Sequence, residues 1–323
     1  KNREPKPESQ PMPLYPVDKP LGLTSFDVVA RARRILGVKK IGHTGTLDPL
    51  ATGVLILCVG DSTKLVQFLT ADRKDYLAFV ALGASTVTLD AEGPILEQVE
   101  RVELPTLEAL EEALKSLRGP QLQIPPQYSA IQVGGKRAYD VARSGGALEL
   151  PVRPVTFYQL EHLQTLQNMD QARALRFAPS EQGWSLAPEG RSFDFPLALG
   201  NFPILMLRTS VSSGTYLRSL ARDLGEALGI PAHLAGLVRT SAGRFTLEQT
   251  TSLENLGQAK AVSELDAMNF PRLEVDAQIA RELREGKKPE TALEGRFVVL
   301  HSGQLVAVVD SLEGRMKSLR VWV

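Results

Sequence analysis

The sequence predicts a mixed α+β fold with a small second domain at the carboxyl end. Amphipathic helical segments and short apolar runs typical of buried strands follow one another without the regular β-α-β order of a doubly wound sheet. No segment repeats with a period of about 20 to 50 residues, so no repeat architecture is expected. The length of 323 residues fits about two domains of roughly 150 residues each. A hydrophobic content of 43% with 23% charged residues is typical of a chain that buries a sizeable core.

The first elements follow from local patterns. Residues 25–36 predict a helix, because Ser25 is a suitable N-cap, apolar side chains fall on one face, and Gly37 suits a left-handed C-cap. Residues 54–59 and 76–82 are apolar runs that predict buried strands. Further on, leucines recur at helical spacing before a Gly-Pro pair and predict a second amphipathic helix; they are Leu107, Leu110, Leu114 and Leu117.

A third helix is predicted over residues 215–228, where Gly229 follows. Its leucines face inward, and Arg218 and Arg222, four residues apart, share the other side. The carboxyl end has the pattern of a small domain of one helix and several strands. These are residues 276–285, stopped by Gly286, and residues 297–300, 305–309 and 319–323, with a turn at Ser302 and Gly303.

Composition excludes several classes of protein. The uncharged, mainly apolar runs at residues 49–60 and 195–207 are shorter than the roughly 20 apolar residues that span a bilayer, so we expect no membrane partner. Residues 1–13 are polar and proline-rich without the apolar core of a secretory signal, which predicts a disordered tail. The single cysteine, Cys58, and four histidines offer no zinc cluster, which indicates a reducing cytoplasm and no metal.

Charge is balanced overall but not locally. With 37 basic and 37 acidic residues, the net charge gives no global reason to expect a nucleic-acid partner. Between residues 19 and 43, however, the only acid is Asp27, and the basic residues are Lys19, Arg31, Arg33, Arg34, Lys39 and Lys40. On charge alone, a basic binding surface and a solvated helix face explain this stretch equally well.

One loop has the residue types of a catalytic site. Residues 41–53, Ile-Gly-His-Thr-Gly-Thr-Leu-Asp-Pro-Leu-Ala-Thr-Gly, contain three glycines, and Pro49 favours an extended backbone at Asp48. A carboxylate presented in this way is able to act as a nucleophile, a general base or a metal ligand. An Asx-turn or a helix cap is the structural alternative for Asp48, and a hydrogen-bonded structural role is the alternative for His43. No phosphate-binding G-x-x-x-x-G-K-[ST] loop accompanies these residues.

Several segments in a fixed order resemble the TruB family of tRNA pseudouridine synthases. The most specific is Gly-His-Thr-Gly-Thr-Leu-Asp-Pro-Leu-Ala-Thr-Gly at residues 42–53. The others are Lys-Pro-Leu-Gly-Leu-Thr-Ser at 19–25, Asp-Ser-Thr-Lys-Leu at 61–65, Tyr76, Pro-Pro-Gln-Tyr-Ser-Ala at 125–130 and Gly-Thr-Tyr-Leu-Arg-Ser-Leu at 214–220. The resemblance covers residues 14–245 and implies a mixed-sheet pseudouridine synthase fold.

The resemblance implies that Asp48 is the essential aspartate of uridine isomerisation, which breaks the N1–C1′ bond, turns the base and rejoins it through C5. The carboxylate could attack C1′, add to C6 of the base, or remove the 2′ proton to give a glycal, and the sequence leaves these routes open. Arg218 is expected to pair with Asp48. Tyr76 is expected to stack on the extracted uracil and to assist removal of the C5 proton.

The family also implies residues around the flipped nucleotide. His43, Tyr216 and Leu237 match positions that line the pocket or contact the base, with plain core packing the alternative for Leu237. Lys19 and Lys64 are expected in supporting or phosphate-contact roles, or as ordinary surface lysines. The target uridine must leave its stack before reaction, so base flipping is implied. Residues 121–146, with Arg137 and Arg143, resemble the family's mobile thumb loop.

The expected organisation is a tail at residues 1–13, a catalytic domain at 14–270 with an insert of unknown role at about 167–203, and a PUA-like β-barrel RNA-binding domain at 271–323. The implied partner is the T-stem-loop of tRNA, with the uridine at position 55 as target, for a monomeric enzyme without a cofactor. One departure from the family lies before Gly214, where residues 211–213 read Val-Ser-Ser rather than the frequent Cys-Ser-Lys.

The sequence also bears on two other classes of function. A non-catalytic RNA-binding or tRNA-folding module of the same fold would be expected to lack Asp48, Tyr76 or Arg218, and all three are present. Phosphoryl transfer through an aspartyl intermediate would need further acids for magnesium, and residues 30–60 contain Asp48 alone. With no net charge, RNA is expected to bind through Arg31, Arg34, Lys39, Lys40, Arg137 and Arg143, or else across Arg218, Arg222 and Arg239.

Overall fold

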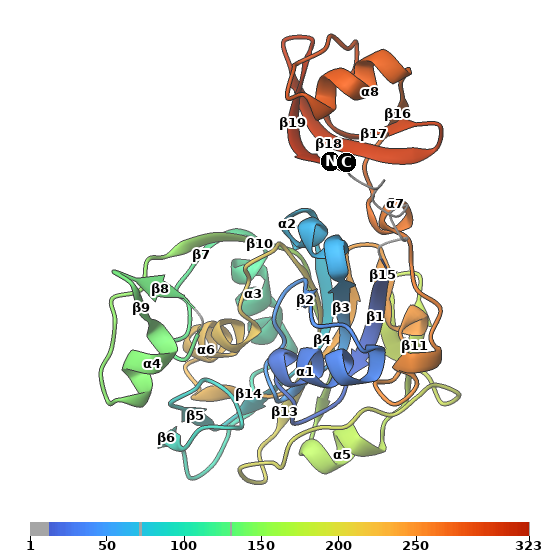
Figure 1. The fold of residues 1–323 in the computed structure, drawn as a ribbon. Helices are drawn as coiled ribbons and strands as arrows, with labels where there is room; N and C mark the ends of the chain where they lie inside the picture. The colour runs from blue at the N-terminus through green and yellow to red at the C-terminus, as the bar shows by residue number, and fades with distance from the viewer. Residues whose placement is uncertain (1–12, 71–72, 130, 323) are drawn as a thin grey trace. The chain divides into compact units, whose positions relative to one another are not determined.

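The computed structural model describes residues 13–70, 73–129 and 131–322, which form two compact units (Figure 1). The larger unit spans Tyr15–Lys260, and the smaller one begins at Ala261 and includes Leu14. Apart from Pro13, the tail predicted for residues 1–13 lies outside the described residues. The functional domain limits at residues 270 and 271 stay a prediction.

A mixed sheet is the framework of the larger unit. Its strands lie in the order β1-β3-β14-β4-β13-β10-β7, with β2 beside β3 and β15 beside β14. Among the described pairs of this sheet, only β3 and β14 run parallel, which places Leu237 opposite Ala51 and Arg239 opposite Gly53. The strands are β1 (Leu14–Lys19), β2 (Ile41–His43), β3 (Ala51–Val59), β4 (Lys74–Leu82), β7 (Gly119–Gln123), β10 (Arg153–Leu166), β13 (Ile204–Val211), β14 (Ala232–Ala242) and β15 (Phe245–Thr246).

Three helices pack on one face of this sheet: α1 (Ser25–Leu36), α3 (Leu107–Leu117) and α6 (Leu217–Leu228). Their apolar stripes join the side chains of alternate strand residues in one buried cluster. All three predicted helices are confirmed, and Gly37 and Gly229 end α1 and α6 in the left-handed conformation. The N-cap of α1 is Thr24 rather than Ser25, with Asp27 completing a capping box.

The predicted insert covers the opposite face of the sheet. It forms α5 (Met169–Ala174), β11 (Phe177–Ser180) and β12 (Gly183–Leu186). The ring of Phe79 on β4 meets the rings of Phe177 and Phe195 edge-on, at centroid distances of 6.2 and 4.6 Å. Phe193 and Trp184 extend this aromatic layer. The insert therefore gives the sheet a second apolar layer, which accounts for a segment whose role the sequence left open.

The remaining described elements of the larger unit are short. Residues 121–146, the predicted thumb, begin in β7 and continue as a small hairpin followed by one helix. The short elements are η1 (Gly60–Leu65), α2 (Val66–Leu69), β5 (Ala84–Thr86), β6 (Ile95–Gln98), β8 (Gln132–Val133), β9 (Lys136–Arg137), α4 (Ala138–Arg143), η2 (Leu247–Gln249) and η3 (Leu256–Gln258).

The smaller unit contains a four-stranded sheet in the order β16-β17-β18-β19, on which one helix, α8 (Ala277–Arg284), packs. The predicted helix and strands are present, although Val323 of the predicted last strand lies outside the described residues, and Ser302 and Gly303 both have positive φ at the predicted turn. In the described residues the sheet is an open path, so the expected small sheet domain is found, but not a closed barrel. Its elements are α7 (Glu264–Ala267), β16 (Arg272–Glu274), α8 (Ala277–Arg284), β17 (Gly295–His301), β18 (Gln304–Leu312) and β19 (Arg315–Val321).

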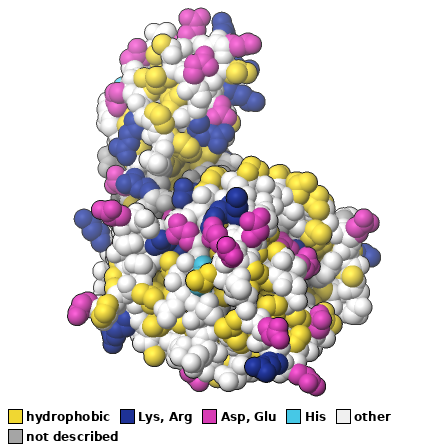
Figure 2. All heavy atoms as spheres, turned by 180° about the vertical axis from the view of Figure 1, so that it is seen from behind, with side chains coloured by type: hydrophobic (Ala, Val, Ile, Leu, Met, Phe, Trp, Pro, Cys, Tyr) yellow, Lys and Arg dark blue, Asp and Glu magenta, His cyan; other side chains and the backbone are white. Residues whose placement is uncertain are grey.

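One face of the molecule reflects the balanced composition. On the face shown in Figure 2, basic side chains lie among acidic ones rather than forming one continuous basic surface. No helix of the described residues has the length and apolar character needed to cross a bilayer.

Candidate active site

The loop that carries Asp48 is held by the segment before α1. The Ser25 hydroxyl accepts a hydrogen bond from the backbone N–H of Leu47 at 2.8 Å and donates to the Leu47 carbonyl at 3.1 Å. The N–H of Gly22 donates to the carbonyl of Pro49 at 2.8 Å. Both neighbours of Asp48 are therefore fixed by hydrogen bonds to residues about 25 positions earlier. This use of its hydroxyl explains why Ser25 does not cap the helix.

Lys19 ends β1, directly before the segment that holds this loop, and is fully buried. Its ammonium donates hydrogen bonds to the carbonyls of Pro20 and Leu23. Burial lowers the pKa of Lys19 from 10.5 to about 8, and the negative charge of Asp48 acts in the opposite direction. Of the supporting, phosphate-contact and ordinary surface roles expected for Lys19, full burial with hydrogen bonds to the segment before α1 fits a supporting role.

Arg218 pairs with Asp48. The sequence predicts that Arg218 lies with Arg222 on the side of α6 away from the core, but the arginine is buried. The Nε atom lies 2.9 Å from Oδ2 of Asp48, and the arginine side chain is 7% exposed while that of Asp48 is 33% exposed. The Nε–H is not aimed at the oxygen, so the contact is an ion pair without an aligned hydrogen bond. Nη1 donates to the carbonyl of Thr88 at 3.3 Å. The carboxylate is thus accessible, and its counter-ion is buried.

A second carboxylate, Asp90, lies beside the same guanidinium and was missed in the sequence. Its Oδ2 atom is 3.7 Å from Arg218 Nε, and its side chain is 4% exposed. Oδ1 accepts hydrogen bonds from the Thr88 hydroxyl at 2.6 Å and from the Glu92 N–H at 3.0 Å. Burial raises the pKa of Asp90, and the charge of Arg218 opposes that rise. A lone aspartate in a turn has no local pattern that would have marked it.

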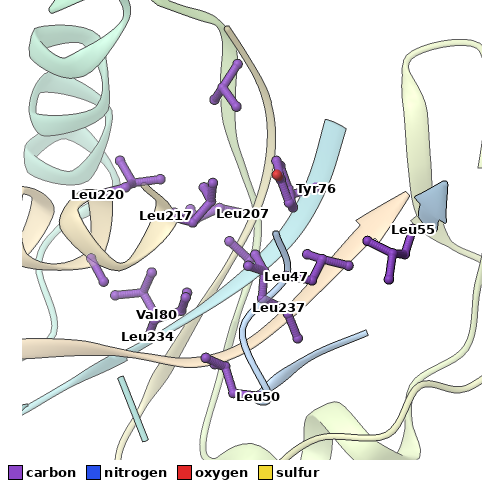
Figure 3. Packing of buried hydrophobic residues seen from close by; sticks show 14 of the residues in the cluster. Leu47, Leu50, Leu55, Tyr76, Val80, Leu207, Leu217, Leu220, Leu234 and Leu237 are labelled. Carbon is purple, nitrogen blue, oxygen red and sulfur yellow. The ribbon is translucent and has the colours of Figure 1, made fainter. Parts of the chain in front are cut away.

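Tyr76 and Leu237 lie in the apolar wall beside the loop. Figure 3 shows them in one packed group with Leu47 and Leu217. The side chains of Tyr76 and Leu237 share one face of the sheet, since Leu237 pairs with Ala78, two residues after Tyr76. Both are nearly buried. The structure therefore brings these two predicted residues next to the Asp48 loop.

His43 and Tyr216 lie at other edges of the site. His43 ends β2, directly before the loop, and burial followed by the charge of Arg239 lowers its pKa, which favours the neutral ring. Tyr216 is the N-cap residue of α6 and packs against the apolar cluster of the predicted thumb. Burial raises the pKa of its hydroxyl.

Among the described residues, the side chain of Lys64 pairs with Asp61 and not with the group around Asp48. Its ammonium lies 3.1 Å from Oδ2 of Asp61, and Lys40 lies 2.9 Å from Oδ1 of the same residue. These three residues form a partly exposed cluster on η1 and the end of the basic stretch.

The chemistry open to this arrangement centres on one accessible carboxylate beside an apolar wall. Arg218 offsets the charge of Asp48 and orients it, and Asp90 fixes Arg218 from its buried side. Within the part of the chain that the structure describes, no group of three or more His, Cys, Asp and Glu side chains is placed to hold a metal ion.

Comparison with known proteins settles the family. Residues 33–178 match the family described as TruB family pseudouridylate synthase (N terminal domain), and residues 218–275 match the tRNA pseudouridylate synthase B C-terminal domain. A protein of Deinococcus radiodurans named tRNA pseudouridine synthase B is 58% identical over 313 residues, which cover 96% of this chain and 100% of that protein. This chain belongs to the TruB family. Its family relative of the same name from Thermus thermophilus is 46% identical over 314 residues, 96% of this chain and 99% of that protein.

Solved structures show the same fold at much lower identity. A structure titled as an H/ACA RNP bound to a substrate RNA containing 2'-deoxyuridine matches with a TM-score of 0.65 and 19% identity, over 96% of this chain and 85% of that one. A Cbf5-Nop10-Gar1 complex matches with a TM-score of 0.65 and 21% identity, over 96% and 84% of the two chains. The expected TruB family membership and mixed α+β fold are therefore confirmed.

Proposed function

We propose that this chain isomerises the T-loop uridine at position 55 of tRNA to pseudouridine, with Asp48 as its catalytic carboxylate. The observation that carries the proposal is the accessible Asp48 paired with the buried Arg218, in the loop whose sequence is the most specific TruB signature. Support comes from TruB relatives named tRNA pseudouridine synthase B over nearly the whole chain. An enzyme of this kind acts in the cytoplasm, where tRNA is modified.

The roles of the surrounding residues follow from their positions. Asp48 acts on the sugar or the base of a flipped uridine, and Arg218 pairs with the carboxylate and orients it. Tyr76 and Leu237 form the apolar wall against which the uracil lies, with Tyr76 placed to assist at C5. His43 and Tyr216 border the site. Lys19 holds the carbonyls of Pro20 and Leu23, in the segment whose Gly22 N–H binds the loop at Pro49. None of these roles requires a cofactor.

The test is modification of unmodified tRNA by the purified protein, with pseudouridine mapped nucleotide by nucleotide. The wild-type chain should convert position 55. Asp48→Asn should abolish conversion and leave the Kd for tRNA nearly unchanged, because the amide keeps the shape of the side chain and removes its charge. An active Asp48→Asn variant would overturn the assignment of the carboxylate. Conversion at another uridine would overturn the target.

A non-catalytic tRNA-folding module is the remaining alternative. It would bind tRNA and speed its folding in the wild-type and the Asp48→Asn chain alike. A wild-type chain that folds tRNA without forming pseudouridine would favour this alternative over the enzyme.

A further inference from the structure

Arg239 is a fully buried arginine on β14, and the reaction outlined above gives it no part. Its side chain is 1% exposed, and it lies on the strand position that pairs with Gly53 of β3 and with Tyr76 of β4. At that position its guanidinium is enclosed by protein. This burial corrects the expectation that Arg218 and Arg239 could form part of an RNA-binding surface.

The guanidinium donates hydrogen bonds to both ends of the catalytic loop. Nε donates to the carbonyl of Val54 at 2.7 Å, Nη2 to the carbonyl of Gly45 at 3.2 Å, and Nη1 to that of Thr46 at 3.4 Å. These carbonyls stand immediately before and after residues 47–53, the segment that contains Asp48. One rigid, planar group therefore ties together the two points where this segment leaves the framework.

The backbone of Arg239 contacts the same loop. At Gly53, with φ of +104°, an added Cβ would lie 2.2 Å from the Arg239 carbonyl oxygen. Only glycine allows this close approach, since any side chain would displace one of the two strands. Backbone and side chain of one residue thus fix the loop end from two directions.

The energetics argue that Arg239 is not there for stability alone. No ion pair of the described residues includes Arg239, so its charge is buried against carbonyl dipoles only. Burying a charge without a counter-ion is costly, and an apolar side chain of similar size would avoid that cost. Arg208 on β13 shows the ordinary solution, because its buried guanidinium pairs with Glu161 at 2.6 Å. The distinctive property of Arg239 is the pair of loop ends that it joins.

We propose that Arg239 is a positioning residue, whose guanidinium holds the ends of the 47–53 segment so that Asp48 stands at the correct distance from the substrate. The proposal rests on the proposed function for its effect on rate. A displacement of about 1 Å at a reacting group costs about 100-fold in rate. Loss of the three hydrogen bonds should therefore act on the chemical step rather than on the affinity for tRNA.

The test compares Arg239→Met, Arg239→Lys and Arg208→Met. Arg239→Met should lower the single-turnover rate at saturating tRNA by about 100-fold, with the Kd for tRNA within about threefold of wild type. Arg239→Lys keeps the charge but loses the planar fork, so its rate should lie between those of the wild type and Arg239→Met. Arg208→Met is the matched control, because it also removes a buried arginine from the same sheet; its rate should stay close to wild type.

Amide hydrogen exchange supplies a readout that does not depend on activity. Exchange in residues 44–53 should be faster in both Arg239 variants and unchanged in Arg208→Met. The proposal is overturned if a folded Arg239 variant keeps the wild-type rate, or if its rate loss comes with faster exchange throughout the sheet, as general destabilisation would produce. Should Arg239→Met fail to fold, Arg239→Lys decides by the same criteria. If the wild-type chain forms no pseudouridine, the proposed function fails, while the exchange data still test whether Arg239 holds the loop.

Discussion

Nε of Arg218 lies 3.7 Å from Oδ2 of the buried Asp90 and 2.9 Å from Oδ2 of the accessible Asp48. The arginine is thus shared by two carboxylates with different exposure. Asp90 is anchored by the Thr88 hydroxyl and the Glu92 N–H, so its position does not depend on Arg218. This arrangement makes Asp90 a support for Arg218 rather than a group that reaches the substrate.

Asp90→Asn should therefore reduce the single-turnover rate by about 10- to 100-fold while tRNA binding changes little. The amide oxygen still accepts both anchoring hydrogen bonds, but the charge that holds Arg218 is lost. Asp223→Asn is a suitable control, because Asp223 is half-buried and pairs with Arg222 at 2.7 Å on the same helix. A rate for Asp90→Asn equal to that of the control would show that Asp48 alone positions Arg218.

Gln123 at the end of β7 should be needed to place the first turn of α6. Its amide donates to the Tyr216 carbonyl at 3.1 Å and accepts from the Tyr216 N–H at 2.8 Å, where the N-cap residue offers no side-chain cap of its own. Gln123→Leu should lower the rate by about 10-fold with little change in Kd, because Arg218 lies two residues further along. Gln121→Leu, on the same strand and bonded only to carbonyls of residues 116 and 118, is the control. Equal rates for the two variants would contradict this prediction.

Lys39 and Lys40 should contribute to the affinity for tRNA and not to the chemical step. Both are exposed and directly precede β2, which leads into the catalytic loop. Replacing both with Ala should weaken binding and reduce the slope of log Kd against log salt by about one or less per lost phosphate contact. Lys40 also pairs with Asp61, so the single variants should differ. An unchanged slope would indicate that tRNA binds at Arg137 and Arg143 instead. The alternative binding path across Arg218 and Arg239 is excluded because both side chains are buried.

Lys19 should make stability rise with pH in the alkaline range. Because burial lowers its pKa from 10.5 to about 8, the folded chain releases this proton before the unfolded chain does. Between about pH 8 and 10.5 the unfolded state then binds more protons, and the free energy of unfolding increases with pH. Chemical denaturation of the wild-type chain and of Lys19→Met across this range measures the effect. The difference in stability should shift in favour of the wild-type chain as pH rises, and a constant difference would show that Lys19 keeps an ordinary pKa.

The sequence predicted what local chemistry determines. Helix α1 ends at Gly37 as predicted, although Thr24 rather than Ser25 caps its start, and the Asp48 loop carried enough residues in a row to identify its family. Residues 51–53 were expected in that loop, but they begin β3, because β14 pairs with them from almost 190 positions later. The burial of Arg218 was missed for a similar reason: its neighbours Asp48 and Asp90 come from distant segments. Local patterns carry no signal for contacts of this kind.

The sheet order also bears on how the chain is made. Strands β3 and β4 are successive along this part of the sequence, yet β14 lies between them in the sheet. During synthesis, the first 80 or so residues leave the ribosome long before β14 at Ala232–Ala242. Until then, β3 and β4 lack the neighbour that covers one edge of each, and a nascent chain with two apolar strand edges is prone to mispairing. Closing the gap requires a parallel pairing over a long chain separation, which is slow. The catalytic centre is consequently completed late, and a chain released before residue 242 would be a substrate for chaperones rather than an enzyme.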